Sequence, residues 1–336
     1  MHLRRADVVA AISPVLRWLL EPQQPPVRYF ALRDLMGRSE SNPEVRKARA
    51  GIPRVGWAAD ILAKRRSDGS WEDGTRLYRP KYLSTHWMLL VLSDLGLTRK
   101  HPAIRESCEL WIERFAKPDG GFGLDGGSRS HLCLVGNTAR ALIRFGYSEH
   151  PAVIRAMEWL VKNADPKGGW SCFGAGRNLD SWEGLSAFAV YPRRRWTPKM
   201  EECVSKGAEF FLSRELQHQG ARYAPWYRTH YPVHYYYDLL VGLDVLTSLG
   251  YSRDPRVSPA LAWMRGKRRA DGRWDLDAAH PDLLGGAADW YRTHPTQRPV
   301  PFQLEAPGRA SKWITLKALV VEERVKSSSR GAPLPP

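Results

Sequence analysis

The sequence predicts an all-α protein, an (α/α)6 toroid of about six helix pairs in which an inner and an outer helix layer surround a central cavity. Three observations predict this fold. A turn followed by an aromatic residue recurs at a fixed spacing, a Gly that ends one helix is followed by a Pro that opens the next, and amphipathic helices alternate with helices that are apolar on all sides.

The first repeat is a helix end, a Gly-containing turn and an aromatic residue. The aromatics stand at positions 71, 122, 170 and 274, so the period is about 50 residues and the last interval is about twice that. A degenerate copy is therefore expected midway, and Trp226 occupies that place. The four copies are Arg66-Ser-Asp-Gly-Ser-Trp71, Lys117-Pro-Asp-Gly-Gly-Phe122, Asp165-Pro-Lys-Gly-Gly-Trp170 and Arg269-Ala-Asp-Gly-Arg-Trp274.

The second repeat is a helix that ends at Gly ahead of a Pro. Gly accepts the left-handed conformation that closes a helix, and Pro is tolerated in the first turn of the next one. An opening copy lies at 29–43 and a closing inner helix at 311–320. The Gly and Pro pairs are Gly96 with Pro102, Gly146 with Pro151, and Gly250 with Pro255.

The two helices of a repeat differ in character. The segment Pro151 to Lys162 has one apolar face and a charged face, whereas Tyr235 to Leu249 is apolar almost all round. A helix of the first kind covers a surface, and one of the second kind is buried between other helices. The alternation predicts concentric layers, and the count of six predicts that the layers close into a ring.

Composition agrees with a single globular body. We expect one toroid domain over residues 1–325 and a flexible C-terminal tail over 326–336, where breakers replace apolar periodicity. The segment Ala6 to Leu20 is expected to be an amphipathic first helix rather than a signal peptide. No stretch has the roughly 18 apolar residues of a transmembrane segment, although peripheral membrane contact stays open.

Charge and cysteine content narrow the class further. The net charge of +16 comes mostly from short clusters such as Arg193-Arg194-Arg195 at predicted helix ends, where they complement the helix dipole. No nucleic-acid partner is expected, because no binding motif accompanies this charge. The 4 cysteines are far apart and form no CxxC pair, so a disulfide framework is not indicated and a cytoplasmic location is expected.

The repeats resemble those of the squalene cyclase and protein prenyltransferase superfamily, the terpenoid cyclase-like α/α toroids. The Asp-Gly-Ser-Trp, Gly-Gly-Trp and Asp-Gly-Arg-Trp copies carry the resemblance, which spans about residues 29 to 325. It implies a double-walled barrel of helices around an apolar cavity, with the starts of the inner helices at one mouth of that cavity. The sequence lacks the Asp-x-Asp-Asp acid motif of the protonation-driven cyclases, and Asp275-Leu-Asp277, its nearest approach, is predicted to be turn chemistry. It also has no Asp-Asp pair for magnesium-dependent ionisation.

Polar residues at the predicted inner-helix starts are the candidate catalytic groups. Each has the alternative of being a satisfied buried polar residue or a helix cap. The candidates are His86, His131, Asp180, His234 and Asp238.

A metal-free diphosphate site would need cationic and hydroxyl donors, and an isoprenoid chain would need aromatic walls. The alternative role for the aromatic residues is packing between the helix layers. The candidate substrate-binding residues are Tyr78, Arg79, Lys81, Trp87, Trp182, Tyr235, Tyr236, Tyr237, Lys312 and Trp313.

A zinc site is the third candidate feature. His131-Leu-Cys133 stands where the resemblance places the Asp-x-Cys of protein prenyltransferases, and Cys172 and His234 would complete a Zn²⁺ ligand set of Cys133, Cys172 and His234. The alternative is that these cysteines are small buried apolar residues.

The leading functional hypothesis is an enzyme related to prenyltransferases and terpene cyclases. It would act on a hydrophobic substrate, for which an isoprenoid diphosphate is one candidate, in a central aromatic cavity and without Asp-x-Asp-Asp protonation. Two alternatives stay open: a non-catalytic toroid that binds a lipid or a protein partner, and a zinc-dependent thiol-alkylating enzyme.

Overall fold

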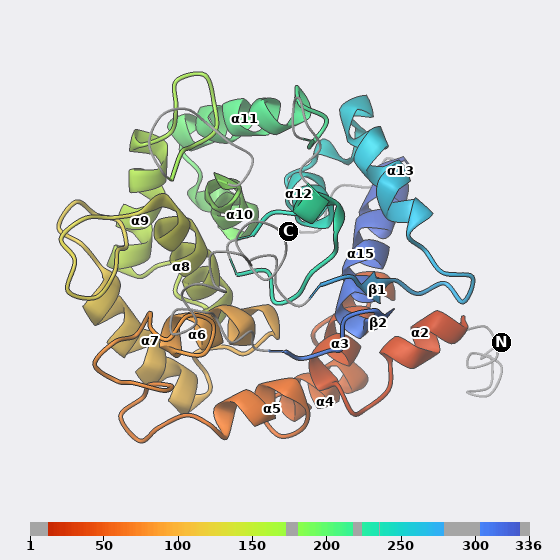
Figure 1. Ribbon diagram of the computed structural model, residues 1–336, viewed down its shortest axis with the longest axis horizontal. Helices are drawn as coiled ribbons and strands as arrows, with labels where there is room; N and C mark the ends of the chain where they lie inside the picture. The colour runs from red at the N-terminus through yellow and green to blue at the C-terminus, as the bar shows by residue number, and fades with distance from the viewer. Residues whose placement is uncertain (1–12, 173–180, 218–223, 235, 279–302, 330–336) are drawn as a thin grey trace, which may run out of the picture.

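The computed structural model describes residues 13–172, 181–217, 224–234, 236–278 and 303–329. These residues form two concentric layers of helices around a central axis, as predicted (Figure 1). The inner layer consists of α3 (Pro25–Phe30) continued by η1 (Ala31–Leu35), α6 (Thr85–Asp94), α8 (Leu132–Phe145), α10 (Glu183–Val190), α12 (Leu239–Ser248) and α15 (Lys312–Ser329). The outer layer consists of α2 (Pro14–Leu19), α4 (Pro43–Gly51), α5 (Trp57–Leu62), α7 (Pro102–Phe115), α9 (Pro151–Lys162), α11 (Pro198–Leu212) and α13 (Ser258–Gly266).

Side-chain chemistry separates the two layers. In α9 the buried residues include Val153, Met157 and Leu160, which recur at helical spacing on one face while the other face is solvated. In α12 nearly every residue is buried, apart from Asp244 and Ser248. The main hydrophobic core therefore lies between the layers, and the inner helices also turn a face toward the axis.

The ring closes through contacts between the first and last inner helices. Helix α15 packs against α3, η1 and α2. The rings of Phe30 and Trp313 lie 6.1 Å apart, and Lys312 Nζ donates to Glu21 Oε2 over 2.8 Å. The described helices thus form a closed toroid rather than an open superhelix.

The repeated tryptophans have the same structural role in three of the repeats. A buried indole N–H needs an acceptor, and in three copies it finds the carbonyl of the residue ten positions earlier, at the end of the preceding outer helix. These bonds run from Trp71 to Ile61 (2.8 Å), from Trp170 to Leu160 (3.0 Å) and from Trp274 to Met264 (2.7 Å). The turn before Trp71 and Trp274 needs a positive φ, which Gly69 (88°) and Gly272 (82°) adopt without a Cβ penalty.

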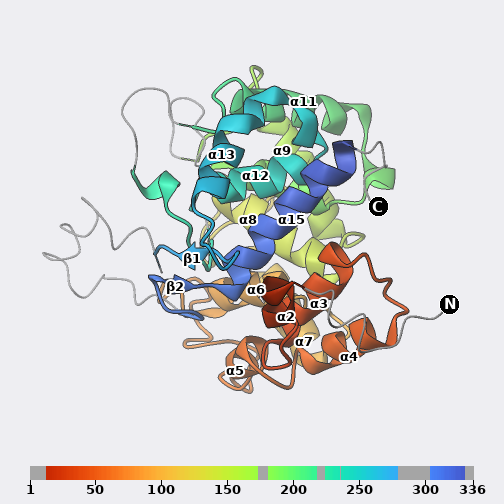
Figure 2. The same cartoon turned by 90° about the vertical axis from the view of Figure 1, so that its right-hand side faces the viewer.

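A short two-stranded sheet lies beside the start of α15 (Figure 2). Its strands β1 (Asp275–Leu276) and β2 (Arg309–Ala310) pair antiparallel. Asp277, just after β1, accepts from Thr229 N at 2.7 Å and from its Oγ1 at 3.0 Å. Asp277 therefore anchors a loop, in line with the turn role predicted for this acidic pair.

Short 3-10 turns connect several of the helices. They are η3 (Arg193–Arg195), η4 (Ala224–Tyr227), η5 (Tyr251–Arg253) and η6 (Pro255–Val257).

The C-terminal boundary differs from the prediction. Helix α15 runs to Ser329, so residues 326–329 of the expected tail are helical, and Ser328 Oγ lies 2.6 Å from Ser252 Oγ. The serines continue the helix because they follow a long run of helix formers and gain this contact with η5. Residues 330–336 and residues 1–12, which include the beginning of the predicted first helix, lie outside the described residues. Among the described helices, none has the length and apolar character needed to cross a membrane.

Candidate functional site

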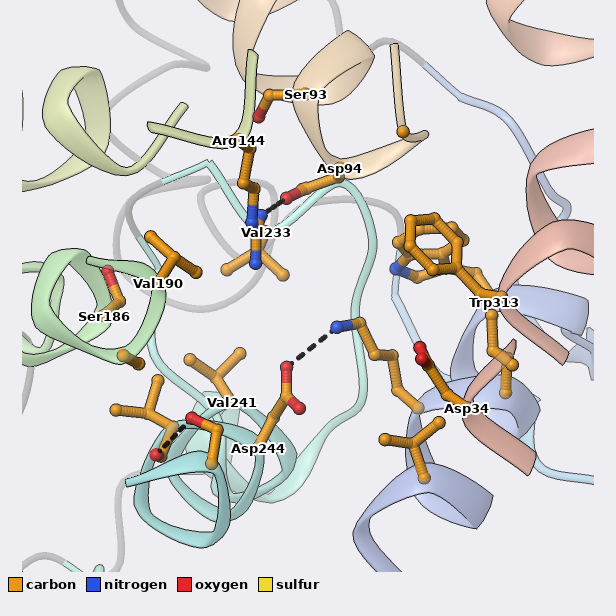
Figure 3. Close-up of a pocket in the computed structure, with 18 of the residues that line it drawn as sticks. Asp34, Ser93, Asp94, Arg144, Ser186, Val190, Val233, Val241, Asp244 and Trp313 are labelled. Atoms are coloured by element: carbon orange, nitrogen blue, oxygen red, sulfur yellow. Dashed lines mark hydrogen bonds and ion pairs between the residues drawn. The ribbon is translucent and has the colours of Figure 1, made fainter. Parts of the chain in front are cut away.

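A cavity of about 410 Å³ lies on the axis of the ring, enclosed by side chains from η1, α6, α8, α10, α12 and α15 (Figure 3). Residues at helix starts and residues near helix ends both line it. Its principal side chains are Phe30, Arg33, Asp34, Asp94, Arg140, Arg144, Trp182, His230, Asp238, Val241, Asp244, Trp313, Lys317 and Arg324.

Ion pairs connect neighbouring inner helices around this cavity. Arg144 near the end of α8 donates to Asp94 at the end of α6 (Figure 3). Asp244 of α12 accepts from Lys317 Nζ at 2.8 Å and from Arg324 Nη1 at 2.7 Å. Burial raises the pKa of Asp244, but the two cations outweigh this effect and hold its pKa well below the usual range. The carboxylate is therefore charged and shared by two cations of α15.

Arg140, one turn before Arg144 on α8, lies inside the ring. It is only 5% exposed, and its guanidinium carbon lies 4.8 Å from the ring centroid of Trp182. Burial lowers the pKa of Arg140 to about 10, against the opposing charge of Asp94. The side chain is thus a cation held in a poorly solvated place over an aromatic face.

His230 and Asp238 form a buried pair on the cavity wall. His230 Nδ1 lies 2.7 Å from Asp238 Oδ2, and both side chains are almost fully buried. Asp238 is the N-cap of α12, where its Oδ1 accepts from Val241 N at 2.8 Å and its Oδ2 accepts from His230 N at 3.2 Å. His230 Nε2 has no hydrogen-bond partner among the described residues. Nδ1 lies within ion-pair distance of Asp238 but does not meet hydrogen-bond geometry, so neither ring nitrogen is hydrogen-bonded among the described residues. The carboxylate is fixed by the two backbone amides, and Nε2 is the nitrogen with no polar neighbour.

Aromatic side chains supply the apolar part of the wall. Phe30, Trp182 and Trp313 line the cavity, and Tyr231 stacks on Trp313 at 4.7 Å between ring centroids. This confirms neither a substrate nor a reaction. It does place Trp182, Asp238 and Trp313, among the residues predicted from the sequence, on one cavity wall.

Other predicted residues are packed elsewhere. His86 and Trp87 at the start of α6 lie in an aromatic cluster, which we define as Tyr78, Tyr82, His86, Trp87, Trp111, Phe115 and His234. His86 stacks on Phe115 at 5.5 Å, and burial lowers its pKa to about 3. His234 lies 4.8 Å from Tyr82 between ring centroids. Neither His86 nor His234 is among the residues that line the cavity.

The predicted diphosphate-binding set is also dispersed. Arg79 is exposed, and Lys81 is half-buried. Lys312 points to the outer layer, where it bonds Glu21 and Trp18 O. These side chains and Tyr78 are not among the residues that line the cavity, because the first turns of α6 and α15 face different neighbours.

The remaining tyrosine and histidine candidates contact other parts of the protein or are exposed to solvent. Tyr237 Oη donates to Leu216 O at 2.9 Å, and Tyr236 Oη lies 3.4 Å from Tyr82 Oη. His131 is exposed at the start of α8. Asp180 and Tyr235 lie outside the described residues.

The three predicted zinc ligands do not all come together. Among the described residues, which include Cys133, Cys172 and His234, no group of three or more His, Cys, Asp or Glu side chains could hold a metal ion. Cys133 and Cys172 do meet: a hydrogen bond between their side chains lowers the pKa of Cys172 to about 7 and raises that of Cys133. His234 is held instead in the aromatic cluster, on another element.

The most informative cavity residues were missed at the sequence level. Arg140, Arg144 and Asp244 are charged residues within otherwise apolar inner helices. A charge in a helix buried on all sides is the signal that identifies them, because such a group needs a partner or a ligand. His230 gives no comparable signal, since its role depends on a contact with Asp238 across a loop.

Comparisons with known proteins give fold-level similarity only. No family model matches the chain, and no curated protein matches it. Among solved structures, the chain is similar to the type II terpene cyclase MstE from Scytonema, with 15% identity, a TM-score of 0.45 and coverage of 92% of this chain and 88% of that chain.

Two further structures are similar to the chain at the same level. A protein from Actinoplanes has 16% identity, a TM-score of 0.44 and coverage of 91% of this chain and 90% of that chain. A variant of MstE in complex with its substrate geranylgeranyl dihydroxybenzoate has 14% identity, a TM-score of 0.35 and coverage of 94% of this chain and 99% of that chain. Similarity of this degree identifies no substrate for the present protein.

Proposed function

We propose that this protein is an enzyme that holds an isoprenoid diphosphate in its central cavity and transfers a proton from the substrate to His230. One observation carries the proposal: a buried imidazole and carboxylate, 2.7 Å apart, line the same cavity as Trp182 and Trp313. The cavity volume of about 410 Å³ lies within the range of small-molecule sites.

The His230 and Asp238 pair has the arrangement of an oriented general base. A carboxylate at Nδ1 favours the tautomer with the proton on Nδ1, which leaves Nε2 as the proton acceptor. Asp238 is held in place by the amides of Val241 and His230, so it does not need to reorganise during proton transfer. This supports a base that removes a proton, rather than the strong acid that the missing Asp-x-Asp-Asp motif supplies.

The chemistry balances with a prenyl diphosphate. The C–O bond to diphosphate breaks and the leaving group takes the electron pair, which leaves an allylic cation. The pair of a neighbouring C–H bond then forms a new C=C bond while His230 Nε2 takes the proton. The faces of Trp182 and Trp313 would stabilise the cation, and the cations of the cavity would stabilise the leaving diphosphate.

A product assay tests the proposal. Purified full-length protein would be incubated with farnesyl or geranylgeranyl diphosphate, and the hydrocarbon products analysed by mass spectrometry. We expect polyene products from the wild type and a loss of about 100-fold or more in rate for Asp238→Asn. Asn retains the N-cap acceptor, so this variant should keep the melting temperature of the wild type.

A matched control is Asp254→Asn. Asp254 also accepts from a backbone amide at the start of a helical turn, in η6, but it does not line the cavity. The Asp254→Asn variant should form product at the rate of the wild type. A wild-type protein that retains the isoprenoid in native mass spectrometry but forms no product would contradict the enzymatic proposal and support the non-catalytic lipid-binding alternative.

A further inference from the structure

Arg140 differs from every other cation that lines the cavity. Arg144 is paired with Asp94, Arg33 donates to Asp34 at 2.6 Å, and both Lys317 and Arg324 share Asp244. Arg140 has neither an ion pair nor a hydrogen bond within the described part of the chain, and its Nε is buried without a partner. Among the described residues, Arg140 is thus a cavity cation with no direct ion-pair partner.

Arg140 lies on a closely packed part of its helix and is almost fully buried. Its helix packs closely on α10: a Cβ at Gly136 would lie 2.6 Å from the backbone of Glu183. The guanidinium rests on Trp182, and the residue is 5% exposed. A long side chain usually carries its charge to the surface, and here the ring of helices prevents this.

An unpartnered buried cation is costly to folding unless something compensates it. The carboxylates of Asp94, Glu183 and Asp244 act on Arg140 through space, but none of them forms an ion pair with it, and Asp94 and Asp244 are paired with other cations. Asp244 itself carries two cations for one carboxylate, which adds to the positive charge of the wall. A bound anion would satisfy this excess.

We propose that Arg140 binds the anionic head group of an amphipathic ligand inside the ring, with the apolar chain of that ligand against Trp313 and Val241. A planar guanidinium matches the paired oxygens of a carboxylate or a phosphate. Trp182 supports one face of the guanidinium and leaves its edge for hydrogen bonds. The inference rests on the proposed function only in using the same cavity, and it names the substrate class: an isoprenoid-like chain with a buried oxyanion.

The test compares ligands that share one chain and differ in the head group. Binding of farnesol, farnesoic acid and farnesyl diphosphate to the full-length protein would be measured by calorimetry. We expect the wild type to bind at least one anionic ligand about tenfold or more tightly than farnesol. Tighter binding of the acid identifies a carboxylate ligand, and tighter binding of the diphosphate identifies a phosphate ligand.

The variant Arg140→Met separates recognition from packing. It should lose the preference for the anionic ligand and keep the affinity for farnesol, while the melting temperature of the free protein rises by about 2 °C because an uncompensated charge is removed. Arg193→Met is the matched control, since Arg193 also stacks on a tryptophan, 3.8 Å from Trp196, but lies outside the cavity. Its preference should be unchanged.

Three results would overturn the inference. They are equal affinity of the wild type for farnesol and both anions, no binding of any of the three ligands, or an unchanged preference in Arg140→Met. Absence of product with an Arg140-dependent preference would instead reject the proposed proton transfer and leave the anion site standing, so the two proposals fail separately.

Discussion

His86 and His230 are both buried close to the start of an inner helix, yet their surroundings differ in kind. His86 lies among the rings of the aromatic cluster, with Trp111 and Phe115 of α7 packed against it. His230 contacts the Asp238 carboxylate and lines a cavity.

Burial alone therefore does not identify a functional histidine. In the aromatic cluster neighbouring side chains occupy the space, and desolvation holds His86 neutral. At His230 a fixed carboxylate and an adjacent open volume provide both a partner for one nitrogen and room for a reactant at the other.

The strongest challenge replaces each histidine by Phe. We expect His230→Phe to lower the rate of product formation by about 100-fold or more, because it removes the proton acceptor. His86→Phe should change the rate by less than about twofold, since its ring is far from the substrate in this proposal. Parallel turnover assays on the two variants measure this, and equal losses would erase the distinction between the two sites.

The second prediction concerns the structural role of the aromatic cluster. Trp87 is fully buried and donates from Nε1 to Tyr78 O at 2.9 Å. Trp87→Ala should lower the free energy of unfolding by about 3–5 kcal/mol through the cavity it leaves. Urea denaturation measures the loss, and a decrease below about 1 kcal/mol would show that the cluster does not support the fold.

The third prediction follows from the low pKa of His86. The folded protein keeps His86 neutral down to about pH 3, whereas the same group in the unfolded chain takes up a proton near 6.5. The unfolded state therefore binds more protons at acidic pH, and stability falls as pH drops from 6.5 toward 3, with His86 contributing up to about 1.4 kcal/mol per pH unit.

Unfolding curves at several pH values, on the wild type and on His86→Phe, isolate this contribution. The slope with pH is the quantity compared, so a difference in overall stability does not matter. Identical slopes would mean that His86 is solvated enough to titrate normally.

The smallest effect concerns the Cys133 and Cys172 pair. With its pKa lowered to about 7, Cys172 should react with iodoacetamide at pH 7 faster than Cys108 and Cys203, whose pKa values burial raises. Cys133→Ala removes the side-chain donor and should slow labelling of Cys172 by about fivefold or more, with little change in stability. Peptide mass spectrometry measures both rates, and an unchanged rate would remove Cys133 as the cause of the shift.

Particular residues show how far the sequence predicts the structure. The tryptophan repeats predicted the helix pairs correctly because each indole bonds the helix end within its own repeat, as Trp170 does with Leu160. The residues of the functional site were harder to predict from the sequence. Trp182, Asp238 and Trp313, which the sequence proposed as site residues, line the cavity, but His230 was passed over for His234, which stands four positions later in the same loop.

The conformation of the loop determines which of these two histidines lines the cavity. His230 forms a bridge with Ala278, and Asp277 anchors the neighbouring Thr229. His234 adopts a positive φ of 50° and turns toward Tyr82. The order of His and Tyr residues in this loop does not indicate which side chain turns toward the cavity.

The helix pairs, their layers and their order follow from the sequence, because periodic apolar residues, capping Gly and Pro and the indole bonds all act within one or two neighbouring repeats. Which polar groups face the axis depends on contacts between distant repeats. Asp244 meets Lys317 across 73 residues, and Arg140 has no ion-pair partner among the described residues, because closing the ring sets which side chains of distant helices come together.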